Sequence, residues 1–362
     1  MGRSADCGGP FDRSARVGSQ CGAEGAALPE GEAPMDPAAP LFMDVDTGID
    51  DAFALLLASA DPGARLVGVS TVVGNVSLAN ATRNTRAVLA LAGRAEVSVS
   101  PGAPLPLAPA PSDARDVHGA TGLGYATLPE PPEPSGVLHA VDAMIAAAWA
   151  HPGRLVLVAT GPLTNVALAA MREPELPRLV GRFVIMGGAY AERGNVTPAA
   201  EFNIWHDPEA AQIVFRAFGG PGAAPAVAIG LDVTRKTVVD EADLATLAER
   251  RPETPRARAL LRFLEDSARF YFDRMERLMG KRVLIMHDPL ALAVALDPTL
   301  VETRSVAVDV ETAGRLTTGA TVADWEGRWG RPMNAEVAVA VDAERFRTTF
   351  LEAMARLAAS AL

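Results

Sequence analysis

The stretch DVDTGIDDA, residues 44–52, joins two apolar runs and decides how the chain folds around them. Residues 41–43 are typical of a buried strand, and residues 52–58 are typical of a buried helix. Gly48 permits a tight turn between them, because glycine lacks the side chain that restricts other residues. The stretch therefore predicts a strand that turns directly into a helix.

Four carboxylates lie within this short turn. Asp44 and Asp46 share one face of the strand, since side chains alternate there, while Asp50 and Asp51 fall at the helix start. Helix-terminal amides favour anions, but carboxylates so close repel one another unless a cation neutralises them. A hard divalent ion such as Ca²⁺ or Mg²⁺, which prefers oxygen ligands, is the natural partner. The alternative is that Asp50 caps the helix and the other carboxylates are solvated.

The composition indicates a large globular protein. With 362 residues and 49% hydrophobic content, the chain can bury a large core, as one α/β domain or two smaller ones. The net charge of −11 argues against nucleic acid as a partner and offers no basic stripe to a membrane surface. No run of about 18 apolar residues is present, so no membrane span is predicted. Cys7 and Cys21 are the only cysteines, which favours a cytoplasmic location over a disulfide framework.

The first 39 residues differ from the rest of the chain. They are rich in Gly, Ala, Pro and Ser, show no apolar period and lack the continuous apolar core of a signal peptide. Residues 1–39 are therefore predicted to be a disordered leader, and residues 40–362 a single large domain. Met35 and Met43 lie close to the first strand and leave a later start of translation open.

Strand and helix patterns alternate from residue 41 onward. Runs that are apolar on both faces predict strands at residues 66–73, 155–159, 183–186 and 226–231. Helical patterns lie between them at residues 78–92, 140–149, 163–171 and 209–218. This alternation predicts an α/β fold with a mostly parallel central sheet flanked by helices, an open Rossmann-like sheet. A long helical segment, 242–279, interrupts the pattern and predicts a cap or an inserted subdomain.

Polar clusters follow four of the predicted strands, which is where parallel sheets bind their ligands. Besides the acidic turn, they are Gly74-Asn75, Thr160-Gly161 and Gly187-Gly188. A further polar stretch at residues 194–208 carries hydrogen-bonding groups suited to a polyhydroxylated ligand: Asn195, Glu201 and Asn203. An extended backbone there would place Glu201 and Asn203 on one side and Phe202 on the other. The alternative is a polar surface loop.

Two Asp-Pro pairs open helices. Asp207-Pro208 is best interpreted as a helix cap alone. Met286-His287-Asp288-Pro289 opens the apolar helix predicted at residues 290–296, and by itself this motif also indicates a cap and a structural histidine. Beside a cation site the interpretation changes, because Asp288 can then be a ligand and His287 a proton donor.

Together these motifs resemble the nucleoside hydrolase family, the inosine–uridine-preferring nucleoside ribohydrolases. The family opens with a DxDPGxDDA turn, which residues 44–52 match at all but one fixed position. The other matching motifs, in order, are Val72-Val73-Gly74-Asn75, residues 159–165 (ATGPLTN), Met186-Gly187-Gly188, the cluster from Asn195 to Asn203, His287-Asp288-Pro289 and a closing stretch at residues 329–342. The resemblance spans about residues 41–357.

The resemblance implies a Ca²⁺-dependent hydrolase that splits ribonucleosides into ribose and free nucleobase and serves nucleoside salvage or catabolism. It implies Ca²⁺ ligation by Asp46, both oxygens of Asp51, Asp288 and the backbone carbonyl of Thr160. A water and two ribose hydroxyls would complete a set of six to eight oxygens. Asp46 would also be the general base that activates this water. A homodimer or homotetramer is expected from the same resemblance.

The resemblance also implies how the nucleoside is held. Asp44 would support the turn from behind, His287 would donate a proton to the leaving base, and His118 would lie at the pocket rim. Base preference would depend on contacts in the region 261–279, where no residue is assigned. The residues expected to contact substrate, mainly through the ribose hydroxyls, are Asp50, Asn75, His118, Asn195, Glu201, Phe202 and Asn203.

The implied chemistry accounts for these residue types. Breaking an N-glycosidic bond passes through an oxocarbenium-like ribosyl cation, which surrounding carboxylates stabilise. Direct attack by water inverts the anomeric carbon. A nucleobase leaves poorly as an anion, so a positioned acid must protonate it.

Two departures from the family pattern stand out. Thr47 replaces a proline in the acidic turn and leaves the carboxylates in place. After His118-Gly119 the family often carries an Asp-Gly pair two residues later, whereas Ala120-Thr121-Gly122 follows here. The contribution of this loop to substrate binding is therefore left open.

Two other classes of protein remain alternatives. Asp44-Val45-Asp46-Thr47 partly fits the DxDxT pattern of haloacid dehalogenase-like Mg²⁺ phosphohydrolases. That interpretation needs a lysine near the phosphate, and Lys236 and Lys281 are the only lysines. It also leaves the cluster from Asn195 to Asn203 without a role. The second alternative is a non-catalytic ribose-binding relative, against which the intact set of acids counts.

Deleting residues 1–39 is expected to leave turnover and oligomeric state unchanged, because the leader shows no apolar period with which to pack on the domain. Activity assays and light scattering on the truncated and full chains test this. Aggregation or lost turnover of the truncated chain would contradict it.

Overall fold

The acidic turn follows an interior strand of the sheet. In the computed structural model, which describes residues 39–108, 115–131, 136–249 and 254–359, β1 (Pro40–Val45) is buried along its whole length. It pairs in parallel with β2 (Arg65–Thr71) on one side and with β4 (Leu155–Ala159) on the other. The leader predicted at residues 1–39 falls almost entirely outside the described residues, so that expectation stays a prediction.

The central sheet is mostly parallel, as predicted. Within the described residues it has eight strands, and only its β12–β9 pair is antiparallel. The strand order is β3 (Val99–Pro101), β2, β1, β4, β5 (Val180–Met186), β6 (Ala226–Ile229), β12 (Ala335–Val341) and β9 (Val301–Val306).

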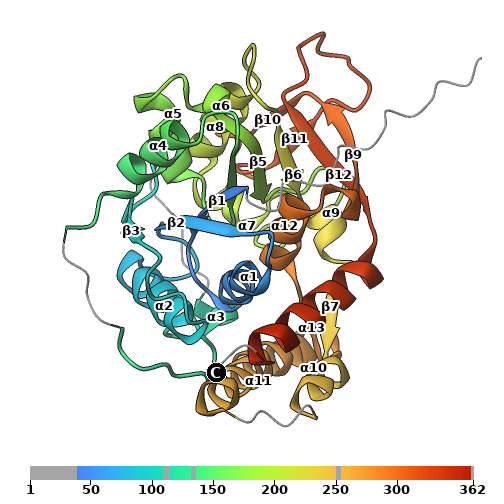
Figure 1. Cartoon of the computed structure of the whole chain (residues 1–362). Coiled ribbons are helices and arrows are strands. Elements are labelled where there is room, and N and C mark those ends of the chain that lie inside the picture. Colours follow the sequence, from blue (N-terminus) through green and yellow to red (C-terminus); the bar gives the residue numbers. More distant parts are fainter. Residues whose placement is uncertain (1–38, 109–114, 132–135, 250–253, 360–362) are drawn as a thin grey trace, which may run out of the picture. The chain divides into compact units, whose positions relative to one another are not determined.

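Helices cover both faces of this sheet (Figure 1). Side chains of β1 alternate between two hydrophobic clusters: Leu41, Met43 and Val45 belong to one, and Phe42 belongs to the other. The first cluster takes in α1 (Ile49–Ala60), α2 (Leu78–Leu91), α11 (Pro255–Met279), α12 (His287–Leu296) and α13 (Ala343–Ala359). The second takes in α4 (Ala140–Ala150), α5 (Thr164–Arg172), α6 (Leu176–Leu179) and α8 (Pro208–Phe218).

The cap or subdomain predicted at residues 242–279 is not separate. The segment forms α10 (Glu241–Ala248) and α11, and α11 begins where Thr254 caps it and Pro255 takes its first position. Phe263 of α11 packs edge-on against Phe53 of α1, with ring centroids 6.4 Å apart. The helix therefore shares the main core because its apolar stripe has a partner there.

Several short elements were not predicted, because runs of three to six residues carry little periodicity. They include α3 (Arg115–His118), α7 (Phe202–His206), α9 (Leu231–Thr234) and a 3₁₀ turn at Pro298–Leu300. β7 (Val238–Asp240) pairs with β8 (Val283–Ile285), and β10 (Val308–Val310) pairs with β11 (Thr321–Ala323), both antiparallel.

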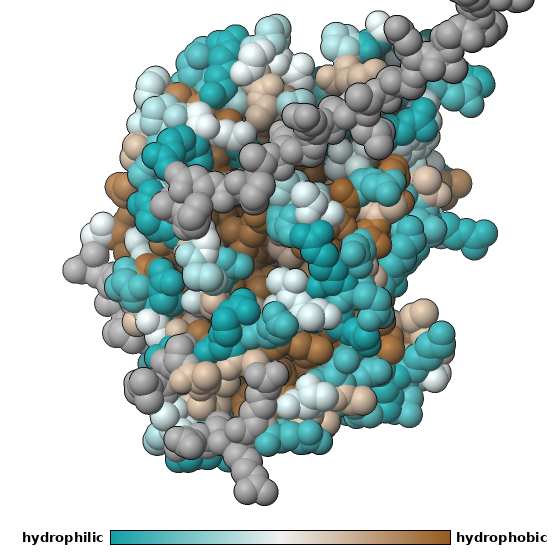
Figure 2. Space-filling view, turned by 45° about the vertical axis from the view of Figure 1, so that its right-hand side comes forward, coloured by the Kyte–Doolittle hydropathy of each residue, from teal (hydrophilic) through white to brown (hydrophobic). Residues whose placement is uncertain are grey.

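The outer surface mixes hydrophilic and hydrophobic residues on the face shown in Figure 2. Scattered exposed apolar side chains are normal for a folded domain. None of the described helices combines the length and the apolar character needed to cross a membrane.

Candidate active site

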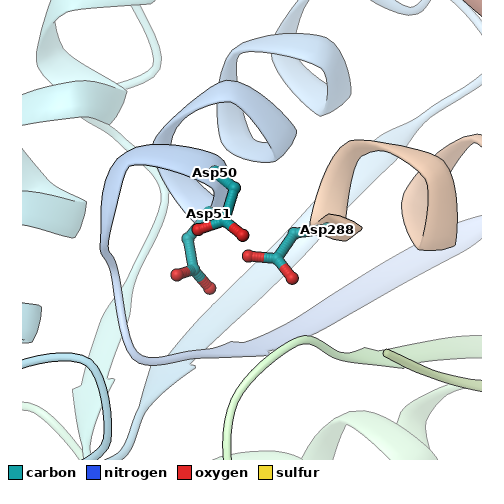
Figure 3. A group of neighbouring side chains, drawn as sticks. All are labelled: Asp50, Asp51 and Asp288. Carbon is teal, nitrogen blue, oxygen red and sulfur yellow. The ribbon is translucent and has the colours of Figure 1, made fainter. Parts of the chain in front are cut away.

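Two helix starts bring three carboxylates together. Asp50 and Asp51 lie in the first turn of α1, and Asp288 lies in the first turn of α12, all three buried. Each offers an oxygen within 4.8 Å of the others, and Figure 3 shows the three side chains converging. Both helices direct their amino ends, with positive partial charge, at this point.

Two glycines allow the turn to close around these acids. The Gly48 backbone N–H donates to Oδ2 of Asp51 at 2.9 Å, and a Cβ on Gly48 would lie 2.5 Å from Nδ1 of His118. A Cβ on Gly74 would overlap Oδ2 of Asp46. Glycine is required at both positions because the backbone approaches functional side chains so closely.

Asn75 links Asp46 to Asp51 at the base of the site. Its backbone N–H donates to Oδ2 of Asp46 at 2.6 Å, and its Nδ2 lies 3.2 Å from both Oδ1 of Asp46 and Oδ2 of Asp51. Thr160 donates its hydroxyl to Oδ1 of Asp51 at 2.7 Å. Asp44 lies behind this layer, where it accepts from Ser70 at 2.6 Å and from Asn165 at 2.8 Å.

Burial and mutual repulsion make these acids costly to ionise. Burial, followed by the charge of Asp51, raises the pKa of Asp50 to about 7 and the pKa of Asp46 well above its ordinary value. Burial, followed by the charges of Asp50 and Asp51, raises the pKa of Asp288 in the same direction.

The acids fit a hard divalent cation. Asp50, Asp51 and Asp288 offer only oxygen donors, and Oδ1 of Asp50 is buried without a hydrogen-bond partner. Asp46, predicted as a ligand, is not part of this three-residue group but lies beside Asp51, whose charge raises its pKa. Asp50, predicted as a ribose contact, takes its place in the group.

A pocket of about 520 Å³ opens over the acids. Of the residues predicted from sequence, Asp46 and Asp51 are fully buried and are not among its described lining residues. The predicted residues that line it are Asp50, Asn75, His118, Thr160, Asn195, Glu201, Phe202, Asn203, His287 and Asp288.

The extended backbone predicted at residues 201–203 is wrong. Glu201 is the N-cap of α7, and its carboxylate accepts from the backbone N–H groups of Asn203 at 2.9 Å, Ile204 at 3.2 Å and Gly188 at 3.0 Å. The capping side chain overrides strand-like alternation, because it offers the first N–H groups of the helix a partner. Burial raises the pKa of Glu201.

The neighbouring amides are also fixed in place. Nδ2 of Asn203 donates to the carbonyl of Thr160 at 2.7 Å and to that of Met186 at 3.1 Å. Oδ1 of Asn195 accepts from the backbone N–H of Phe202 at 3.0 Å. Asp207 caps α8 as predicted and also accepts from the Thr164 hydroxyl at 2.6 Å.

Both histidines of the pocket are neutral at pH 7. Burial lowers the pKa of His118 to about 3, and its Nδ1 accepts from the backbone N–H of Ile49 at 3.1 Å, which leaves the proton on Nε2. The 3.8 Å approach of this Nδ1 to Oδ1 of Asp50 is therefore not an ion pair. Burial, followed by the charge of Arg235, lowers the pKa of His287 to about 4.

Other lining residues were missed by the sequence analysis or assigned only to a region. Leu231 and Arg235 follow β6, so the rule that ligands bind at carboxyl ends of strands points to them. The segment 261–279, predicted to contact the base, contributes several side chains of α11 to the wall. They are Tyr271, Arg274, Met275, Leu278 and Met279.

Comparisons with known proteins agree on one family. The family model described as inosine-uridine preferring nucleoside hydrolase matches residues 41–348. The chain is 37% identical over 319 residues to the inosine-uridine preferring nucleoside hydrolase of Crithidia fasciculata, covering 88% of this chain and 98% of that protein. It is 40% identical over 320 residues to a non-specific ribonucleoside hydrolase of Shigella boydii, covering 87% and 98%.

A solved structure agrees with these matches. The purine-preferring ribonucleoside hydrolase from Gardnerella vaginalis superposes with a TM-score of 0.81 at 34% identity, covering 88% of this chain and 99% of that one. The chain belongs to the inosine-uridine preferring nucleoside hydrolase family. It is accordingly an enzyme, a hydrolase that acts on the N-glycosidic bond of ribonucleosides.

Without its cation, the protein is expected to become less stable as the pH rises from about 4 to about 7. The pKa of Asp50 is about 7 in the fold against 3.8 for the free side chain, so the folded state binds more protons and its stability falls as pH rises through that window. Thermal melts in chelator should show a Tm that falls from pH 5 to pH 8. In Asp50→Asn the Tm should depend less steeply on pH. A Tm that rises over this range, with the same slope in both proteins, would contradict the expectation.

Proposed function

We propose that the chain hydrolyses ribonucleosides in a Ca²⁺-dependent reaction in which Asp46 takes the proton from the attacking water. The observation that carries this proposal is the convergence of buried Asp50, Asp51 and Asp288 beneath a pocket, with Asp46 beside them. Buried acids of one sign, with one oxygen lacking a partner, are costly unless a cation completes the site.

Asp50, Asp51 and Asp288 would hold the cation, and the family roles add Asp46 and the carbonyl of Thr160. Several buried oxygens on two helices and two loops suit Ca²⁺, which accepts six to eight ligands, better than the strict octahedron of Mg²⁺. A bound Ca²⁺ would supply the charge that lowers the pKa of a neighbouring water.

Asp46 is suited to act as the base. Its two oxygens are oriented by Asn75, whose backbone and side-chain donors lie 2.6 and 3.2 Å away. Burial and the charge of Asp51 raise its pKa in the cation-free fold, and a bound Ca²⁺ would oppose this rise and keep the carboxylate ionised, as a general base must be.

The opposite wall would hold the ribose. Asn195, Glu201 and Asn203 present amide and carboxylate groups to the pocket, and Phe202 lines it beside them. Asp50 and Asn75 would contact the ribose hydroxyls from the acidic side. Carboxylates on both sides of the sugar would stabilise the positive charge that develops as the glycosidic bond breaks.

His287 would serve the leaving base first as a neutral hydrogen-bond donor, and it would deliver a proton only after taking one up from solvent as negative charge develops on the base. Its Nδ1 lies 2.8 Å from the hydroxyl of Thr234, and if that hydroxyl donates, the ring carries its proton on Nε2. Neutral imidazole is a weaker acid than imidazolium but a competent hydrogen-bond donor to a base nitrogen. His118 would assist from the rim.

The substrate, assembly and location follow by analogy with relatives. The name of the Crithidia relative suggests inosine and uridine as the first nucleosides to test, and the Shigella relative is named as non-specific, so the other ribonucleosides belong in the same panel. We further propose a homodimer or homotetramer, a cytoplasmic location, and a leader at residues 1–39 that takes no part in the reaction.

Asp46→Asn is expected to reduce kcat by about 10²–10⁴-fold, the usual contribution of a general base, while the fold is kept. Release of free base and reducing sugar from inosine and uridine measures turnover.

In a separate test of the cation, Ca²⁺ should raise the Tm of the chelator-treated wild-type protein, and Asp288→Asn should abolish that increase. A metal-free protein with full activity would contradict the cation requirement.

His287→Ala is expected to slow natural nucleosides by about 10²-fold more than p-nitrophenyl riboside, whose leaving group needs no proton. Asn203→Ala is the matched control, because loss of a ribose contact should affect both substrates alike. Equal losses on both substrates in His287→Ala would mean that the proton comes from elsewhere, with His118 or Tyr271 next to be tested.

A further inference from the structure

A single loop carries Asn195 and leads to Glu201, two of the residues proposed to bind the ribose. Residues 187–200 follow β5, include Asn195 and lead directly to Glu201, the N-cap of α7. Within the loop, the backbone N–H of Asn195 donates to the carbonyl of Ala200 at 3.1 Å, and the hydroxyl of Thr197 accepts from Ala200 at 3.0 Å. The far half of the loop thus closes on itself.

The near half of the loop is held by one carboxylate. Oδ1 of Asp232 accepts from the backbone N–H groups of Ala191 at 2.7 Å and Glu192 at 3.2 Å, and Oδ2 accepts from Tyr190 at 3.0 Å. Asp232 is buried, on the short helix α9. Without Asp232 the buried N–H of Tyr190 would lack a partner, which is costly, and the part-buried N–H groups of Ala191 and Glu192 would lose the acceptor that holds them in place.

The contact between α9 and the loop is close-packed. The backbone N–H of Leu231 donates to the carbonyl of Gly188 at 2.9 Å. A Cβ on Gly230 would lie 2.9 Å from Oδ2 of Asp232 and 2.9 Å from that same carbonyl. The loop therefore has little room to shift against α9 while Asp232 is in place.

A second charged side chain follows α9 and holds the loop further along. Arg235 donates from its guanidinium to the carbonyl of Gly194 at 2.9 Å, directly before Asn195, and lies 3.4 Å from the carboxylate of Glu192. Arg235 lines the pocket, whereas Asp232 is not among its described lining residues. Asp232 is therefore placed to act on substrate through the backbone it holds and not by direct contact.

We propose that Asp232 is a positioning residue for the hydrolysis, because it fixes the loop that presents Asn195 and Glu201 to the ribose. This inference rests on the ribose-binding role given to those two side chains under the proposed function. Asp232 contributes an acceptor for backbone N–H groups and touches neither substrate nor the acids.

The test is steady-state hydrolysis of inosine or uridine by the full chain, with free D-ribose as a competitive inhibitor. Asp232→Ala should raise both KM and the ribose inhibition constant by about tenfold, as expected when three backbone N–H groups of the loop lose their shared acceptor and the loop relaxes. A purely structural role would lower only the active fraction, which reduces kcat and leaves both constants unchanged.

Asp232→Asn provides the conservative variant and covers the case in which Asp232→Ala fails to fold. Its amide oxygen can replace Oδ1, which accepts two of the three N–H groups, so both constants should rise by only about threefold. The matched control is Asp61→Ala at the far end of α1. Asp61 also accepts a loop N–H, that of Gly63 at 2.7 Å, and should leave both constants unchanged.

A double-mutant cycle separates this proposal from the role given to Asn195. If Asp232 acts through the loop, adding Asp232→Ala to Asn195→Ala should weaken ribose inhibition less than the product of the single effects. Unchanged constants in folded Asp232→Ala and Asp232→Asn, or fully multiplicative effects, would overturn the proposal. If Asn195→Ala alone leaves ribose inhibition unchanged, the ribose role of Asn195 fails, and the shift in Asp232→Ala still decides whether the loop is positioned by Asp232.

Discussion

The rest of the site depends on the burial of several carboxylates side by side. Asp46, Asp50 and Asp288 all have raised pKa values, because burial and neighbouring negative charge act in the same direction. Part of this cost is offset by the amino ends of α1 and α12 and by donors from Asn75 and Thr160. These contacts orient the acids without supplying a positive charge, so a bound cation would be needed to keep all of the acids ionised together.

The sheet order explains how these groups meet. β1 lies between β2 and β4, so the segments after these three strands bring Asp46, Asn75 and Thr160 to one edge. β5 and β6 follow in the same order, and they contribute the loop that ends at Glu201 and the helix α9. Neighbouring strand ends therefore supply most of the acidic wall and the wall around Asn195 and Glu201, while α12 contributes Asp288 and α11 supplies a further wall.

The local parts of this arrangement could be predicted from sequence, and the long-range parts could not. The acidic turn and the Asp207 cap carry their own short-range signals, and the structure has both. The error at residues 201–203 arose because Glu201 bonds to the amides that follow it, a choice that alternation cannot reveal. Asp232 gave no signal, because its partners lie about 40 residues earlier in the chain.

Arg274 illustrates the same limit on the α11 side. It lies 3.1 Å from Asp116 of α3, and only the packing of α11 on the main core brings the two together. Asp116 is largely exposed, so this ion pair contributes little to stability. The pair joins the segment that carries His118 to the helix that carries Tyr271, both of which line the pocket. Its consequence is geometric, because it links two walls of the pocket that lie far apart in the sequence.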